Sequence, residues 1–179
     1  MLSIKEGQLS ETAGLFRRYH VRLYNFFLRL TMDRAVSEDL TQNLFYRLIR
    51  YRQSWQPGNG SFQSWIFRMA RNIYADHCKQ TARNPGRPVA FAAEEEEMED
   101  RRIGYTEEHY ARLDLALAGL HPEQREVLIL SRYQGLKYEE IARIKDISVS
   151  AIKVQVHRAL KQLRSLYFGK EDNSGGLAR

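Results

Sequence analysis

The chain of 179 residues has one cysteine, Cys78, and no long apolar run. A single thiol excludes an internal disulfide framework and a zinc site built from several cysteines. No apolar stretch approaches the roughly 18 residues that a membrane span needs, and the first residues lack the apolar centre of a signal peptide. We therefore expect no membrane insertion and a cytoplasmic location.

The sequence also lacks the residue groupings on which catalysis depends. It has no metal-ligand cluster, no Gly-rich phosphate loop and no nucleophile paired with a base. His77 and Cys78 are adjacent, and adjacent residues of a helix point in different directions. We expect no catalytic residue, no metal and no cofactor, hence a protein that is not an enzyme. An enzyme acting on nucleic acid is a competing hypothesis, but the only dense acidic residues lie in the run AAEEEEMEDRR at 92–102.

Apolar residues recur at three- and four-residue steps, and no stretch alternates long enough to suggest a strand. Ser37, followed by Glu38 and Asp39, predicts a helix start, and Ser61 predicts another after a Pro-Gly break. Pro122 is placed as a first helical residue, and further helices are predicted at 138–144 and 149–167. The fold class is all-α: two small helical domains at 1–84 and 108–168, a flexible acidic linker at 85–107 and a disordered tail at 169–179.

The net charge of +6 divides unevenly along the chain. Residues 1–90 carry +8, residues 91–110 carry −6 and residues 111–179 carry +4. Basic domains commonly bind polyanions, of which nucleic acid is the most frequent. Charge alone leaves open the alternative that lysine and arginine only keep the helix surfaces soluble.

The segment YEEIARIKDISVSAIKVQVHRALKQL, at 138–163, has helix-turn-helix spacing. Ala142 is small where two helices cross, Asp146 stands in the turn where glycine is common, and Ser148 can cap the second helix. In such motifs the second helix enters the major groove of DNA. The alternative is a helical hairpin with a basic solvated face. The face expected to be exposed carries Ser150, Lys153, Val154, His157, Arg158 and Lys161.

Two further helix faces stand out in the N-terminal half. Residues 47–87 hold eight basic residues and one acid, and Trp65, Arg68, Asn72 and Lys79 recur at helical spacing. Cations interleaved with aromatic rings suit single-stranded nucleic acid, although the residues alone favour Trp65 and Tyr74 as core. Asp39 and Gln42 lie one turn apart with Asn43 and Tyr46 nearby. That arrangement could bind a partner, with solvated surface as the favoured alternative.

Taken together, these residues resemble a known family. SEDLTQNLFYRLIRYR and FQSWIFRMARNIYADHCKQTAR resemble region 2 of bacterial sigma factors, and the segment from LDLALAGLHPEQREVLIL to VHRALKQL resembles their region 4. The short linker between them is typical of the extracytoplasmic-function (ECF) group. The resemblance implies a protein that binds core RNA polymerase, recognises a promoter and helps to melt it. A stand-alone helix-turn-helix transcriptional regulator is the alternative function.

The resemblance also implies roles for individual residues and for partners. It implies an RNA polymerase core and promoter DNA, both duplex and melted strand, as partners, together with an anti-sigma factor. The acidic segment 91–107 corresponds to the tether that family members thread through polymerase. Two departures concern Val154-Gln155, where Ser-Arg is frequent, and Asn43, where an acid is common. The implied sites are polymerase docking at Asp39, Gln42, Asn43 and Tyr46; downstream promoter DNA at Asn59, Ser61, Phe62, Trp65, Arg68, Asn72 and Lys79; and upstream promoter DNA at Ser150, Lys153, Val154, His157, Arg158 and Lys161.

Overall fold

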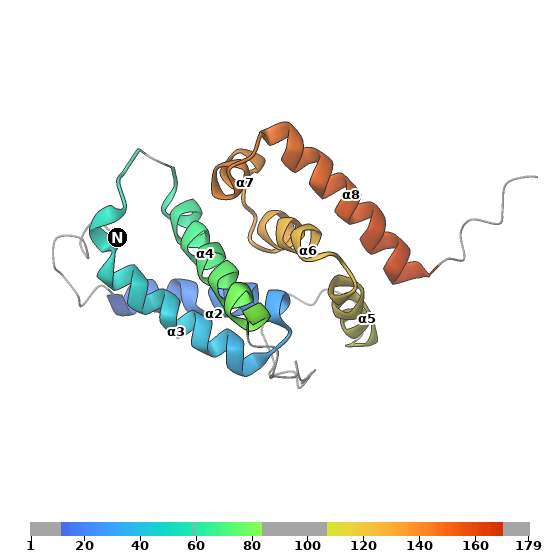
Figure 1. Ribbon diagram of the computed structural model, residues 1–179, viewed down its shortest axis with the longest axis horizontal. Coiled ribbons are helices and arrows are strands. Elements are labelled where there is room, and N and C mark those ends of the chain that lie inside the picture. The colour runs from blue at the N-terminus through green and yellow to red at the C-terminus, as the bar shows by residue number, and fades with distance from the viewer. Residues whose placement is uncertain (1–11, 59, 84–106, 170–179) are drawn as a thin grey trace, which may run out of the picture.

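The computed structural model describes residues 12–58, 60–83 and 107–169, and all regular structure within these ranges is helical (Figure 1). The predicted all-α fold with two helical domains is confirmed. The predicted linker, apart from its last residue, and the predicted tail, apart from Gly169, lie outside the described residues. The elements are α2 (Thr12–Thr31), α3 (Arg34–Arg50), the 3₁₀ turn η2 (Arg52–Ser54), α4 (Phe62–Arg83), α5 (Glu107–Ala118), α6 (Pro122–Leu128), the π-helical turn η3 (Ile129–Tyr133), α7 (Tyr138–Lys145) and α8 (Val149–Phe168).

Helices α2, α3 and α4 pack around a core rich in phenylalanine. The rings of Phe26 on α2 and Phe67 on α4 meet edge to face, with their centroids 5.4 Å apart. Such pairs are more favourable than their buried area alone. The spacing of the apolar residues explains the burial, because positions three and four apart share one helix face. The fully buried side chains of this group include Leu23, Phe26, Phe27, Leu44, Leu48, Ile66 and Phe67.

The second helix starts one turn earlier than the sequence predicts. Asp33 is the N-cap of α3, and its carboxylate accepts a hydrogen bond from the Val36 N–H at 3.0 Å. Ser37 is fully buried, and its hydroxyl donates to the Asp33 carbonyl at 2.6 Å. The predicted start at Ser37 is wrong because Asp33 already caps the helix and the serine satisfies its hydroxyl inside the first turn. The other predicted cap is confirmed, since Ser61 accepts from the Ser64 N–H at 3.0 Å.

The C-terminal helices form the predicted helix-turn-helix. Helix α6 begins at Pro122, as expected, and α7 and α8 match the predicted ranges to within one residue at each end. Asp146 adopts the left-handed conformation between them, with φ 55° and ψ 47°, in the place where glycine is common. Ser148 caps α8 by accepting from the Ala151 N–H at 3.2 Å. The left-handed Asp146 and the Ser148 cap therefore set the direction of α8 relative to α7.

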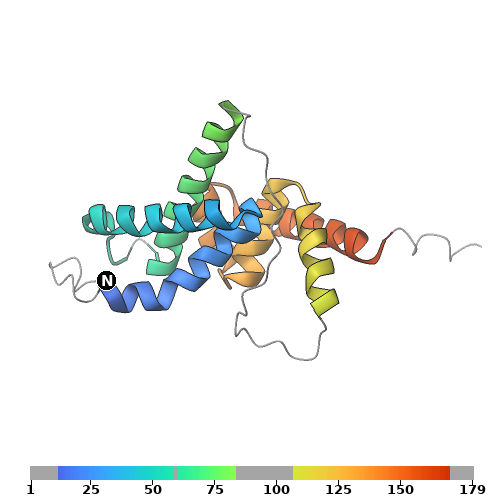
Figure 2. The same ribbon diagram turned by 90° about the horizontal axis from the view of Figure 1, so that it is seen from below.

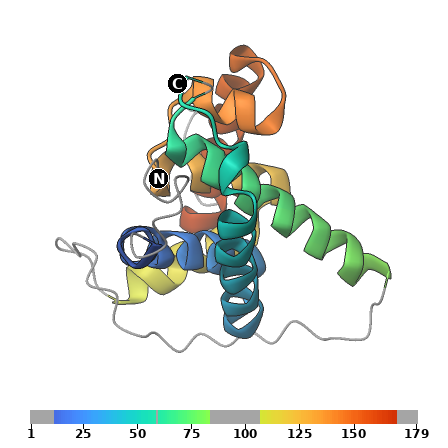
Figure 3. The same cartoon turned by 90° about the vertical axis from the view of Figure 1, so that its left-hand side faces the viewer.

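The two helical groups pack directly against one another. Helix α4 contacts α7, and α2 contacts α5, α6 and η3, so the buried apolar side chains of both groups form one continuous cluster. Figure 3 shows the start of α4 lying beside α7, and Figure 2 shows the C-terminal half of α4 projecting away from the bundle. The sequence predicts two helical domains joined by a linker and does not predict that their helices pack together. No helix in the described ranges is both long enough and apolar enough to cross a membrane.

Candidate nucleic-acid and polymerase interfaces

The outer face of α3 presents the residues predicted to bind a protein partner. Asp39 and Gln42 are exposed, and Tyr46 keeps 63% of its surface open to solvent. Asn43 is half-buried, and its side-chain oxygen accepts from Arg47 Nε at 3.1 Å. The opposite face of α3 is buried through Leu40, Leu44 and Leu48. An amphipathic helix thus turns the predicted residues outward because its apolar stripe turns inward.

The loop before α4 leads into a group of aromatic rings. Gly60 has φ 105°, a conformation that favours glycine, and a Cβ there would lie only 2.9 Å from the Ser64 hydroxyl. Ser61 is exposed, whereas Asn59 lies outside the described residues. The ring of Phe62 contacts those of Tyr19, Trp55 and Trp65, with centroid separations of 5.4, 5.9 and 5.6 Å. Phe62 is half-buried, so part of its ring stays accessible at the start of α4.

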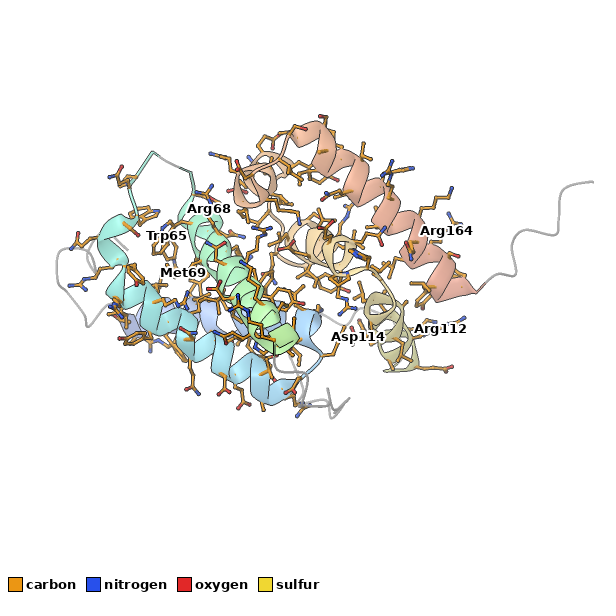
Figure 4. The ribbon with its side chains drawn as sticks, in the orientation of Figure 1. Trp65, Arg68, Met69, Arg112, Asp114 and Arg164 are labelled. Atoms are coloured by element: carbon orange, nitrogen blue, oxygen red, sulfur yellow. The ribbon has the colours of Figure 1, made fainter. Side chains whose placement is uncertain are left out.

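The remaining predicted residues of α4 divide by burial. Arg68, Asn72 and Lys79 are exposed, whereas Trp65 is half-buried against the core, as is Tyr74. Figure 4 shows Arg68 on the side of α4 that faces α7, with Trp65 and Met69 on the opposite side. The interpretation that Trp65 and Tyr74 pack against the core therefore agrees with their positions in the structure. The exposed amide and cations form a polar strip beside them.

All six predicted residues of α8 are exposed. The exposed side of the helix carries Ser150, Lys153, Val154, His157, Arg158 and Lys161. The opposite side is buried through Ile152, Val156 and Ala159. Arg158 also lines a small cavity of about 220 Å³ between α8 and the start of α6. Three cations, a histidine and a hydroxyl can contact phosphates and base edges, and Val154 offers an apolar contact. This face runs from the first turn of α8 to Lys161.

The described residues hold no group of three or more His, Cys, Asp or Glu side chains that could bind a metal ion. Cys78 is a free, exposed thiol on α4. What the geometry offers is instead three outward polar faces on α3, α4 and α8.

Comparison with known proteins gives two family matches, one in each group of helices. Residues 15–84 match the family model "Sigma-70 region 2" and residues 110–163 match "Sigma-70, region 4". The ECF RNA polymerase sigma factor ShbA of Streptomyces griseus is 32% identical over 175 residues, which cover 90% of this chain and 90% of ShbA. The chain belongs to the ECF sigma factor family.

Two further comparisons concern the length of the chain relative to a relative and its fold. This sigma factor is 30% identical over 168 residues to the ECF RNA polymerase sigma factor SigE of Mycolicibacterium smegmatis, and it spans 62% of SigE's length. The sigma factor RpoE of Bartonella quintana, solved in complex with the anti-sigma factor NepR, superimposes with a TM-score of 0.70 at 23% identity. That superposition covers 88% of this chain and 97% of RpoE, and shows a shared fold.

In this sigma factor the helices of region 2 are hydrogen-bonded to those of region 4, through contacts that the sequence does not predict. Arg22 Nη2 donates to the Gln134 carbonyl at 2.8 Å, and Gln63 Nε2 donates to the same oxygen at 2.9 Å. Arg68 Nη2 donates to the Arg143 carbonyl at 2.6 Å. Scattered arginine and glutamine residues on polar helix faces carry no periodic signal that would have identified these contacts.

One buried carboxylate joins three helices. Glu126 on α6 is 7% exposed, and its Oε1 lies 3.0 Å from Nε of Arg71 on α4. Its second oxygen pairs with Nζ of Lys145 on α7. Hydrogen bonds to an ionised group are stronger than neutral ones, so this group holds region 4 together and links it to region 2.

Two half-buried tyrosines, Tyr74 and Tyr133, lie where the regions meet. Burial raises the pKa of the Tyr133 phenol above its ordinary value, and the neighbouring Arg29 guanidinium partly opposes that shift. The Arg29 guanidinium lies 4.2 Å from the centre of the Tyr133 ring. Burial, followed by the neighbouring Cys78, raises the pKa of Tyr74, whose hydroxyl donates to the Leu30 carbonyl at 3.3 Å. Both phenols therefore stay protonated at neutral pH.

Proposed function

We propose that this sigma factor binds core RNA polymerase and directs promoter-specific transcription initiation, including promoter recognition and melting. The observation that carries the proposal is that one chain combines a helical region 2 with a region 4 helix-turn-helix whose recognition face is exposed. Polymerase performs the chemistry, and the sigma factor contributes binding energy. Because its partners are polymerase and chromosomal DNA, it acts in the bacterial cytoplasm.

The outer face of α3 is the proposed polymerase-docking surface. Asp39, Gln42 and Tyr46 follow one another on successive turns of α3 and are exposed, with half-buried Asn43 between them. A carboxylate, an amide and an exposed aromatic ring provide charge, hydrogen bonding and apolar area on one face. The exposed ring of Tyr46 is the natural anchor, because tyrosine is enriched among residues that dominate binding energy.

The start of α4 is the proposed surface for the melted strand. Flipping a base out of a duplex costs a few kcal/mol, and stacking on an aromatic ring contributes about 1–3 kcal/mol per base. The half-buried rings of Phe62 and Trp65 are held by neighbouring aromatics, so each presents a fixed edge or face. Arg68, Asn72 and Lys79 continue along the helix as phosphate and base contacts, and Asn59 and Ser61 in the preceding loop complete the proposed site.

The exposed side of α8 is the proposed reader of the upstream promoter element. Recognition helices use their first turns to meet base edges in the major groove. Ser150, Lys153 and Val154 lie in those turns, and His157, Arg158 and Lys161 follow along the same side. The apolar Val154, 47% exposed, suits a thymine methyl group, whereas the cations suit phosphate or guanine.

Control by an anti-sigma factor is part of the proposal. Its support is the fold shared with RpoE, which was solved in complex with the anti-sigma factor NepR. The exposed faces of α3 and α8 are the surfaces that such a partner would cover to prevent polymerase or promoter binding.

The test separates a sigma factor from a stand-alone regulator, which the joint match to regions 2 and 4 does not favour. Genomic fragments are selected by the chain alone, by core polymerase alone and by the two together. A sigma factor retains discrete fragments only in the combined sample. A dimer that retains a palindromic site without polymerase would instead identify a stand-alone regulator.

A further inference from the structure

Asn43 on α3 stands at the edge of the proposed polymerase-docking face, where it is half-buried between exposed Gln42 and Tyr46. Its side-chain Oδ1 accepts a hydrogen bond from Nε of Arg47, one turn further along α3, at 3.1 Å. The Arg47 guanidinium also pairs with Asp76 on α4, which packs on α3, with Nη1 and Oδ2 3.6 Å apart. Three polar side chains therefore form a chain that runs from α4 to the docking face.

The contact with Arg47 decides which end of the Asn43 amide is left for a partner. A guanidinium carries five N–H donors and no acceptor, so the amide can turn only its oxygen toward Arg47. Its nitrogen, Nδ2, then lies on the other side of the amide group and carries two donors. Within the residues that the structure describes, Nδ2 has no hydrogen-bond partner and is not a buried unpaired atom, so it reaches solvent. Asn43 therefore offers N–H donors on the docking face.

Asp76 restricts the Arg47 side chain from the side of α4. The side chains of Arg47 and Asp76 are 36% and 50% exposed, and an ion pair this open to water adds little to the stability of the fold. Its effect on orientation is more specific. Because Nε and Nη1 belong to one rigid planar group, pairing Nη1 with Asp76 favours the orientation in which Nε donates to Asn43. Asp76 therefore acts on the docking face through Arg47.

From these contacts, and resting on the proposed function, we infer that Arg47 and Asp76 are positioning residues that hold Asn43 as a hydrogen-bond donor toward polymerase. The polymerase surface opposite Asn43 then carries an acceptor, which is a carboxylate or carbonyl oxygen. An aspartate at position 43 would keep the contact with Arg47 but would present an acceptor to that acceptor. The orientation of one amide therefore contributes to the choice of partner.

Asn43→Asp tests the donor, because a carboxylate has nearly the same shape as the amide but no N–H. Surface plasmon resonance measures binding of the full chain to immobilised core polymerase. Asn43→Asp should weaken binding by at least about fivefold, since the acceptor on polymerase is left unpaired. Gln80→Glu, which adds the same charge at an exposed position of α4, should bind as the wild type does. Equal or tighter binding by Asn43→Asp would overturn the donor role.

Asp76→Asn tests the positioning in a double-mutant cycle. Alone it should weaken core binding by about twofold to fivefold, and Asp76→Glu, which keeps the carboxylate, should restore most of the loss. In an Asn43→Ala background it should have no further effect, because the amide to be positioned is gone. The same loss in both backgrounds would overturn the positioning role, since a general charge or structural effect does not need Asn43. If Asp76→Asn lowers the unfolding midpoint, Arg47→Lys, which keeps the charge but not the planar group, takes its place.

The side-chain amide of Asn43 gives a second readout that needs no polymerase. Its nitrogen–proton NMR signals, assigned by their loss in Asn43→Ala, should shift in Asp76→Asn and stay in place in Glu108→Gln, which removes the same charge from an exposed position of α5. Signals that do not move in Asp76→Asn would overturn positioning by Asp76. Failure of the proposed function is distinguishable, because the wild-type chain would then not bind core polymerase at all while the amide signals still respond to Asp76→Asn.

Discussion

Arg71 of region 2 and Glu126 of region 4 form an ion pair across the boundary between the two regions, with Nε and Oε1 3.0 Å apart. The same carboxylate pairs with Lys145, whose side chain is 6% exposed, inside region 4. Glu126 therefore serves both the fold of region 4 and the contact between regions. Arg71, at 32% exposure, serves only the contact.

This asymmetry predicts unequal effects on stability. Glu126→Ala leaves the Lys145 ammonium buried without its partner and should lower the free energy of unfolding by about 3–5 kcal/mol. Arg71→Ala removes a partly exposed partner and should cost about 1 kcal/mol or less. Urea unfolding measures both, with the exposed Glu123→Ala as control. Equal losses in the two variants would contradict the dual role of Glu126.

The cap of α3 predicts a local loss of stability. Asp33→Ala removes the acceptor of the Val36 N–H and should lower the free energy of unfolding by about 1 kcal/mol. Thermal or urea unfolding measures the change, and Glu38→Ala, exposed on the same helix, should be nearly neutral. A neutral Asp33→Ala would show that the helix does not depend on this cap.

Burial of Tyr133 predicts sensitivity to alkaline pH. Because burial raises its pKa in the folded state, the unfolded state releases the phenolic proton first as the pH rises through 10. Above the ordinary pKa of tyrosine, the buried Tyr133 phenol therefore lowers the free energy of unfolding more and more as the pH rises. Tyr133→Phe should therefore show a shallower loss of stability between about pH 9 and 11. Identical slopes for the wild type and Tyr133→Phe would refute the assignment.

The recognition face of α8 predicts a specific salt dependence. Arg158→Ala should weaken binding of the promoter's upstream duplex, and the slope of log K against log salt should become shallower by about 0.9 if one phosphate contact is lost. Arg112→Ala removes one cation from α5, which Figure 4 shows away from the start of α8, and should leave the slope unchanged. Fluorescence anisotropy over a salt series tests this. The same slope in wild type and Arg158→Ala would remove Arg158 from the phosphate contacts.

The outer face of α3 predicts a loss of polymerase affinity without a loss of stability. Gln42→Ala should weaken core binding by roughly tenfold, as about 1.4 kcal/mol of lost binding energy gives, and leave the unfolding midpoint in place. Gln80→Ala, exposed near the end of α4, is the matched control. Surface plasmon resonance on immobilised core polymerase measures both. Equal affinities would count against docking through Gln42.

The helices and their outward faces were predictable because apolar periodicity fixes both. The stripe of Leu40, Leu44 and Leu48 decides that Asp39 and Gln42 point outward, and the same reasoning exposes the recognition side of α8. The cap at Asp33 was missed because Ser37 followed by two acids is an equally good local start signal. Only burial of Ser37 distinguishes the two.

The packing of region 2 on region 4 was not predictable from local pattern. It depends on Arg22, Gln63 and Gln134, polar residues whose sequence neighbours give no hint of a partner more than 70 positions away. Trp65 shows a related limit. Its side chain packs against the core and remains half-exposed, so the core interpretation describes its packed side, and the proposed DNA contact would use the exposed side.

The most direct test of the proposed function is run-off transcription with start-site mapping on genomic fragments, with purified core polymerase and this chain. We predict discrete start sites that appear only when both are present and that share sequence elements upstream. Transcription that starts at the same scattered positions with and without the chain would contradict its role as a sigma factor.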